Sequence, residues 1–171
     1  MNPSPKPQPA AEAGRYLTFS LGDESYGFPV LKVRAIIRLC PITPVPRMPA
    51  YVKGVINLRG TVIPVFDLRA KFQFATTSYG ERSCIIVVQV AMPSGENTMI
   101  GTIVDAVEEV VHLTPADIEA APDFGGAPDT QCILGLATIQ GGVKTLLNVE
   151  KIFLEDGSFS LTSTLKPEVG P

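Results

Sequence analysis

The sequence predicts an all-β fold built as two similar lobes, each a small barrel of about five short strands. Three observations lead to this expectation. Val and Ile recur in short runs that are broken by 15 glycines and 16 prolines, a pattern typical of many short strands. Hydrophobic residues make up 45% of the 171 residues and charged residues only 18%, as in folded rather than disordered chains. The third observation is an internal repeat.

The repeat consists of two blocks, each of which aligns without a gap. Residues 53–72 match residues 134–153 at a shift of 81 positions, so that glycines meet glycines and apolar residues meet apolar residues. An earlier block, 26–37, matches 100–111 at a shift of 74. The extra residues of the second repeat fall in a longer linker at 123–129. A long unit that occurs only twice favours two similar lobes over a solenoid array.

Both repeats predict the same order of elements. The expected strands are 16–21, 25–30, 54–58 and 61–68 in the first repeat, and 84–92, 98–104, 135–139 and 143–149 in the second. After the second strand of each repeat, β-branched residues at helical spacing predict about one helical turn that runs into a third strand. Glycine at each hairpin tip, Gly60 and Gly141, supplies the positive φ that a tight turn requires. Short helices are expected at 68–72 and 148–153.

The folded part is expected to cover residues 14–155, with one lobe at about 14–72 and the other at about 83–155. Whether the lobes exchange strands stays open at this point. Residues 1–13 are rich in Pro and Ala and are interpreted as a disordered tail, and residues 156–171 as a second flexible tail. No signal peptide or membrane-spanning run is apparent, so we expect a cytoplasmic protein.

Few residues suit catalysis or metal binding. His112 is the single histidine and lies in an apolar stretch, which leaves a catalytic triad without its base. The three cysteines have neither metal-ligand spacing nor an even count, and we expect them to be buried thiols of a reducing cytosol: Cys40, Cys84 and Cys132. Asp105, Glu108 and Glu109 lack the spacing of a calcium loop. The sequence therefore predicts no catalytic residue, no metal and no cofactor.

Charge is distributed unevenly along the chain. Residues 32–71 hold eight basic residues and one acidic residue, whereas residues 96–123 hold seven acidic residues and no Lys or Arg. These segments could simply be solvated faces, or they could orient a head-to-tail contact with partners of similar shape. The basic segment also raises an OB-like nucleic-acid-binding module, but Tyr51, Phe66, Phe72 and Phe74 fit core or hairpin positions better than an exposed stacking platform. The overall acidity, with a pI near 5.2, disfavours nucleic acid as a partner.

Two adjoining segments closely resemble the signature of the CheW chemotaxis coupling proteins: residues 52–60 (VKGVINLRG) and 62–69 (VIPVFDLR). Residues 19–27 and 101–107 are similar to other segments of that family, and the resemblance extends over about residues 15–155. It implies two SH3-like five-stranded barrels related by internal duplication, with short helices.

The same resemblance implies a function. CheW-type proteins are non-enzymatic adaptors that couple the cytoplasmic tips of methyl-accepting chemoreceptors to the regulatory domain of the histidine kinase CheA, which shares the two-barrel fold. A protein of this kind would be cytoplasmic, recruited to receptor arrays at the inner membrane and associated with the membrane only through receptors. A paralogous chemosensory pathway, one that controls pili or gliding, is the alternative; an OB-like nucleic-acid binder is less favoured.

The resemblance also implies partner-binding residues. At the hairpin tip these are Asn57, Leu58, Arg59 and Gly60. The candidates beside or within a groove between the lobes, where a receptor helix would dock, are Val33, Arg34, Ile36, Val104 and Val107. Asn57 and Gly60 could instead shape the hairpin, and the valines could pack in the core. Many relatives carry an acidic residue where this chain has Ala35, so Arg59 needs another partner, for which Asp67 is a candidate.

Overall fold

The structure, a computed structural model, describes residues 13–72, 74, 78–120 and 132–154. Its strands are β1 (Gly14–Leu21), β2 (Glu24–Pro29), β3 (Val33–Arg38), β4 (Val52–Leu58), β5 (Thr61–Asp67), β6 (Cys84–Ala91), β7 (Asn97–Val104), β8 (Ala106–Leu113), β9 (Ile118–Glu119), β10 (Ile133–Ile139) and β11 (Gly142–Leu147). Its short helices are η1 (Val30–Lys32), α1 (Leu68–Lys71), η2 (Pro115–Asp117) and α2 (Val149–Leu154). The predicted all-β fold with short helices is confirmed. The tails and the linker at 123–129 lie outside the described residues.

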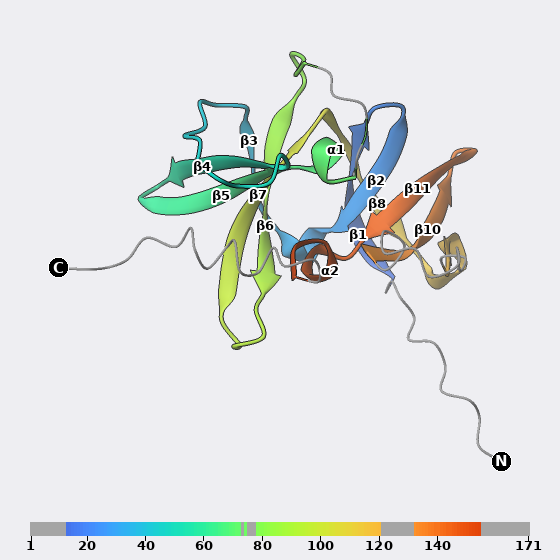
Figure 1. Cartoon of the computed structure of the whole chain (residues 1–171). Helices are drawn as coiled ribbons and strands as arrows, with labels where there is room; N and C mark the ends of the chain where they lie inside the picture. The colour runs from blue at the N-terminus through green and yellow to red at the C-terminus, as the bar shows by residue number, and fades with distance from the viewer. Residues whose placement is uncertain (1–12, 73, 75–77, 121–131, 155–171) are drawn as a thin grey trace.

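The strands form two sheets that stand beside each other, with α1 and α2 near the middle of the molecule (Figure 1). Within the described residues, one sheet has six strands in the order β8-β1-β2-β11-β10-β9, and the other has five in the order β3-β6-β7-β5-β4. Each sheet therefore takes a hairpin from the other half of the chain. The β1–β2 hairpin of the first repeat lies parallel to β11 through β2, and the β6–β7 hairpin of the second repeat lies parallel to β5 through β7.

The two repeats share even their irregularities. The strand register shifts at Arg34 in β3 and at Glu108 in β8, which are equivalent at the shift of 74. It shifts again at Lys53 in β4 and at Leu134 in β10, which are equivalent at the shift of 81. Such β-bulges bend a strand at a fixed place. Because the bulges coincide, the duplication extends from the sequence to the backbone.

One predicted element is present in only the first repeat. There, η1 follows β2, as expected, and Pro29 ends the strand because its fixed φ and missing N–H interrupt the ladder. Ile103 stands at the equivalent position of the second repeat and continues β7. Asp105 alone separates β7 from β8, and its N–H donates to the carbonyl of Ser20 at 3.0 Å. The prediction of a second helical turn was wrong because this bond holds Asp105 against the neighbouring sheet.

The largest apolar cluster lies between the two sheets. It contains fully buried rings from both, including Phe19 and Phe28 of the six-stranded sheet and Phe66 of the five-stranded one. Phe153 of α2 meets Phe66 edge to face, with ring centroids 5.0 Å apart. Each sheet also has a smaller apolar cluster of its own, which contains Ile63 and Ile85 in the five-stranded sheet and Tyr16 and Leu146 in the six-stranded sheet. Since each fully buried aromatic side chain stabilises the fold by roughly 2–3 kcal/mol, this shared core holds the two sheets together.

Candidate functional site

The tip of the β4–β5 hairpin is exposed and its conformation is fixed. Arg59 and Gly60 both have positive φ, 53° and 87°. The Asn57 side-chain oxygen accepts a hydrogen bond from the Gly60 N–H at 2.9 Å, which closes the turn. Asn57 and Gly60 therefore shape the hairpin, and their neighbours Leu58 and Arg59 carry the side chains that a partner could contact. Leu58 is half-buried, whereas Arg59 is exposed.

Arg59 forms no ion pair with another residue in the described part of the chain. The candidate partner Asp67 is buried elsewhere, as the residue that caps α1. One oxygen of its carboxylate accepts from the Arg69 N–H at 2.9 Å, and the other accepts from the Tyr79 hydroxyl at 2.6 Å. The expectation that Asp67 pairs with Arg59 was wrong, because Asp67 is already held by groups that lie beside it. The Arg59 guanidinium thus faces solvent.

Tyr79 and Tyr26 make the free energy of unfolding depend on pH in the alkaline range. Burial, followed by the hydrogen bond to Asp67, raises the pKa of Tyr79 above the ordinary tyrosine value of about 10. Burial and Glu24 raise the pKa of Tyr26 in the same direction. Above about pH 10 the unfolded chain loses these protons while the folded chain keeps them. We expect the free energy of unfolding to fall as pH rises from 10, and urea titrations should show a shallower fall for Y26F/Y79F. An equal fall in both proteins would contradict this assignment.

Strand β3, at the edge of the five-stranded sheet, presents a basic stripe. Its alternate side chains face solvent, namely Arg34, Ile36 and Arg38. Ile36 is 48% exposed, which is unusual for a large apolar side chain in this structure. Arg34 is steadied by a hydrogen bond from its Nε to the Gln89 side chain at 2.7 Å. We call these three residues the β3 stripe.

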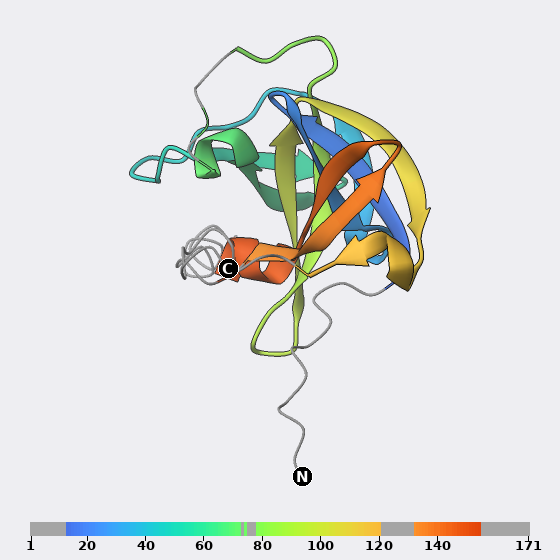
Figure 2. The ribbon, with the colours of Figure 1, turned by 90° about the vertical axis from the view of Figure 1, so that its right-hand side faces the viewer.

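Strand β8, at the edge of the six-stranded sheet, presents the equivalent stripe, with a carboxylate in place of Arg34 and an imidazole in place of Arg38. Shifting the β3 stripe by 74 positions gives Glu108, Val110 and His112, which are all exposed and which we call the β8 stripe. Val110 is 55% exposed. His112 faces solvent because β8 turns its neighbours Val111 and Leu113 inward. Both edge strands run along the side of the molecule away from α1 and α2 (Figure 2).

The groove candidates separate into surface and core. Val33 and Val107, which are equivalent in the two repeats, are partly exposed and pack against the central apolar cluster. Val104 is completely buried in that cluster, so in this structure it packs in the core, which is the other role that the sequence left open for the valines. It ends β7 opposite Cys84, and its side chain points into the core. Alternating apolar residues do not reveal which of them the core will bury.

Charge is divided between the two ends of the molecule. The residues of the five-stranded end, 30–72 and 78–104, include nine basic and three acidic residues. The residues of the six-stranded end, 13–29, 105–120 and 132–154, include three basic and eight acidic residues. Hairpin exchange leaves this division unchanged, because the exchanged segments 13–29 and 78–104 each hold one basic and two acidic residues. The molecule therefore has one basic and one acidic barrel.

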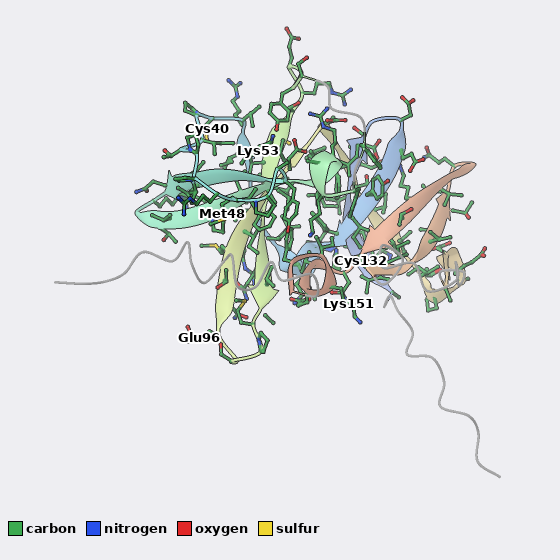
Figure 3. All side chains as sticks on the ribbon, in the orientation of Figure 1. Cys40, Met48, Lys53, Glu96, Cys132 and Lys151 are labelled. Atoms are coloured by element: carbon green, nitrogen blue, oxygen red, sulfur yellow. The ribbon has the colours of Figure 1, made fainter. Side chains whose placement is uncertain are left out.

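Other features bear on chemistry. Cys40 and Cys132 lie in different halves of the molecule (Figure 3), and all three cysteines are partly buried thiols. Burial raises the pKa of the Cys84 thiol, which favours its unreactive protonated form. Across the described ranges, no three His, Cys, Asp or Glu side chains gather closely enough to hold a metal ion. No helix among the described residues is long and apolar enough to span a bilayer.

The aromatic side chains that base stacking would need are packed within the fold. Phe66 is fully buried, and Tyr51, Phe72 and Phe74 pack against the central cluster. Lys71 lies over the Tyr51 ring, with its Nζ 4.2 Å from the ring centroid. Single-strand binding by an OB-type barrel needs exposed rings beside a basic groove. The described rings do not form such a platform.

Comparison with known proteins gives a consistent result. The family described as the CheW-like domain matches residues 15–156. Chemotaxis protein CheW of Klebsiella aerogenes is 35% identical over 137 residues, 80% of each chain, and that of Rhizobium meliloti is 33% identical over 80% of this chain and 85% of its own. Protein FrzA of Myxococcus xanthus is 29% identical over 80% and 83% of the two chains. The crystal structure of the scaffolding protein TtCheW from Thermoanaerobacter tengcongensis aligns with a TM-score of 0.75 and 31% identity, covering 85% of this chain and 95% of that one.

Proposed function

This chain belongs to the CheW family, and from that premise we propose that it is a non-enzymatic adaptor between chemoreceptors and a CheA-type histidine kinase. The proposed partners are the cytoplasmic tip of a methyl-accepting receptor and the regulatory domain of the kinase. The match to a scaffolding protein over most of the chain supports this role. The adaptor would work in the cytoplasm at receptor arrays of the inner membrane and would meet the membrane only through receptors.

The division of charge between the two barrels is the main observation that supports the proposed contact with the kinase. The regulatory domain of the kinase is expected to have two barrels of the same kind. A basic barrel on one molecule and an acidic barrel on the next fix a head-to-tail orientation, because complementary potentials favour one register and like charges oppose the others. The β3 stripe and the hairpin tip lie at the basic end, and the β8 stripe lies at the acidic end.

The receptor contact rests on apolar groups that the two edge strands leave accessible. Val33 and Val107 stand at equivalent places beside the central cluster, and Ile36 and Val110 are exposed farther along each strand. A receptor tip is helical, and a helix that lies across such side chains would use apolar anchors three or four residues apart. Exposed large apolar side chains on a folded domain commonly mark a contact surface.

Replacing Arg59 with alanine tests the hairpin tip. We expect R59A to weaken assembly of the three-component complex about tenfold, because a guanidinium at the tip can bind a carboxylate or a carbonyl of the partner. Pull-down of kinase regulatory domain and receptor fragment, quantified against protein concentration, measures the loss. Circular dichroism should stay unchanged, since Arg59 forms no ion pair within the described chain. An unfolded R59A, or a folded one with unchanged assembly, would count against this role.

An adaptor role in a paralogous chemosensory pathway is the second candidate, and the match to FrzA favours it. Binding to the kinases of the separate pathways in the source organism distinguishes the two, because only the cognate regulatory domain should bind tightly. The OB-like nucleic-acid module is the weakest candidate. Its complex with a single strand would lose orders of magnitude in affinity as salt rises, which a titration from low to high salt measures directly.

A further inference from the structure

Two ion pairs occupy equivalent places in the two repeats, with opposite polarity. Arg69 of α1 lies with its Nη1 atom 3.2 Å from an oxygen of Asp105. A shift of 81 positions from Arg69 leads to Glu150 of α2, whose Oε2 atom lies 2.8 Å from the Lys32 ammonium. The helix residue is thus the cation in one pair and the anion in the other.

In each pair, the partner of the helix residue lies in the segment that immediately follows the exchanged hairpin. Asp105 directly follows β7, and Lys32 ends the helical turn that follows β2. Lys32 is one residue beyond the position equivalent to Asp105 at the shift of 74. The charge that each short helix contacts therefore depends on the inserted hairpin: α1 contacts the acid that follows β7, and α2 contacts the base that follows β2.

The same carboxylates also bind the backbone of the opposite sheet. The second oxygen of Asp105 accepts a hydrogen bond from the Gly22 N–H in the β1–β2 turn at 2.6 Å. Oε2 of Glu150 accepts from the Ala91 N–H, at the end of β6, at 2.9 Å. The Arg69 side chain is only 7% exposed, and leaving such a buried guanidinium without its acidic partners would be costly.

The alternative arrangement, in which each hairpin stays with its own repeat, would bring like charges together. Arg69 would then face the segment that ends in Lys32, and Glu150 would face Asp105. Apolar packing discriminates less between the hairpins, because Gly27 of β2 and Gly101 of β7 take the same place beside Leu146 and Val65. We propose that Arg69–Asp105 and Glu150–Lys32 are specificity pairs that select hairpin exchange between the repeats.

Charge inversion in the full-length chain tests the proposal. One variant inverts the hairpin side, K32E/D105K, a second inverts the helix side, R69E/E150R, and a third combines all four substitutions. The measurements are the urea midpoint and the nuclear Overhauser contacts of β2 with β11, as in the native pairing of Tyr26 and Thr145, or with β5. We expect each double variant to have a lower urea midpoint and fewer native β2–β11 contacts. The quadruple variant should regain the native contacts and part of the midpoint, because the hydrogen bonds that Asp105 and Glu150 accept from the backbone stay lost.

The control is K144M, which removes a Lys144–Glu108 pair of 3.1 Å between strands of one sheet. It should keep all native strand contacts. A double variant with new β2–β5 contacts would support the proposal directly. Double variants with the urea midpoint of the wild type would overturn the proposal. A quadruple variant that is no more stable than the double variants would also overturn it, even if the double variants fail to fold. That second result would mean that the side chains act through local packing and not through complementary charge.

Discussion

Reversing the charge of both arginines of the β3 stripe, R34E/R38E, is expected to weaken binding to the kinase regulatory domain about 100-fold. Each reversal should cost about 1.4 kcal/mol, which corresponds to a factor of ten, because it turns an attraction across the contact into a repulsion. Both arginines are exposed at a sheet edge, so the fold should stay intact. Titration calorimetry at low ionic strength measures the loss, and added salt should reduce the difference between variant and wild type.

Arg15 provides a matched control for this prediction. It is also an exposed arginine on an outer part of a sheet, but it lies opposite His112 in the acidic end. R15E changes the net charge in the same direction as each substitution of the β3 stripe. Its affinity for the kinase domain should stay within about twofold of wild type if charge acts locally. Equal losses in R15E and R38E would show that only net charge matters and would remove the head-to-tail assignment.

Replacing Gly54 with alanine is expected to destabilise the protein by about 4 kcal/mol or more, a large part of an ordinary domain's stability. A Cβ atom at Gly54 would lie 2.0 Å from the carbonyl oxygen of Thr43, and the residue has a φ of 140°. Thr43 cannot move away freely, because it exchanges two backbone hydrogen bonds of 2.9 Å with Val55. We expect a strongly lowered urea midpoint and poor recovery of folded G54A.

Gly141 separates the two causes of this effect. It has a φ of 83°, but a Cβ there would meet nothing within 4 Å. G141A should therefore cost only the strain of a left-handed residue, about 1–2 kcal/mol. If urea unfolding showed that G54A and G141A are equally stable, the close approach of the Thr43 carbonyl to Gly54 would not be the reason that glycine is required there.

The repeat allowed much of the fold to be predicted, because hairpins and closing helices follow local rules. Positive φ at the tips, as at Gly60, and the short helix after Asp67 follow from turn and capping chemistry. The same local rules could not predict which of the two hairpins, β1–β2 or β6–β7, joins which sheet. Two repeats with similar apolar patterns offer two similar ways to pair, and the charged pairs that distinguish them join residues far apart in sequence.

The candidate site was predictable where exposure follows from strand alternation. Arg34 and Ile36 face solvent on β3, but the same alternation gave no reason to separate Val104 from Val107. The β8 stripe was missed as a set. Shifting the β3 stripe by 74 positions would have found it, because the repeat preserves exposed positions as well as buried ones.

The parallel contacts of β2 with β11 and of β5 with β7 bear on how the protein acquires its structure during synthesis. Neither sheet can be completed from one half of the chain, and residue 25 must find residue 144. Contacts so distant in sequence slow folding, because loop closure comes before any gain from pairing. A ribosome that has released only the first half leaves β3, β4 and β5 without the β6–β7 strands beside them. In the nascent chain, the five-stranded sheet should therefore gain protease resistance only after β7 emerges, and the six-stranded sheet only after β11 emerges.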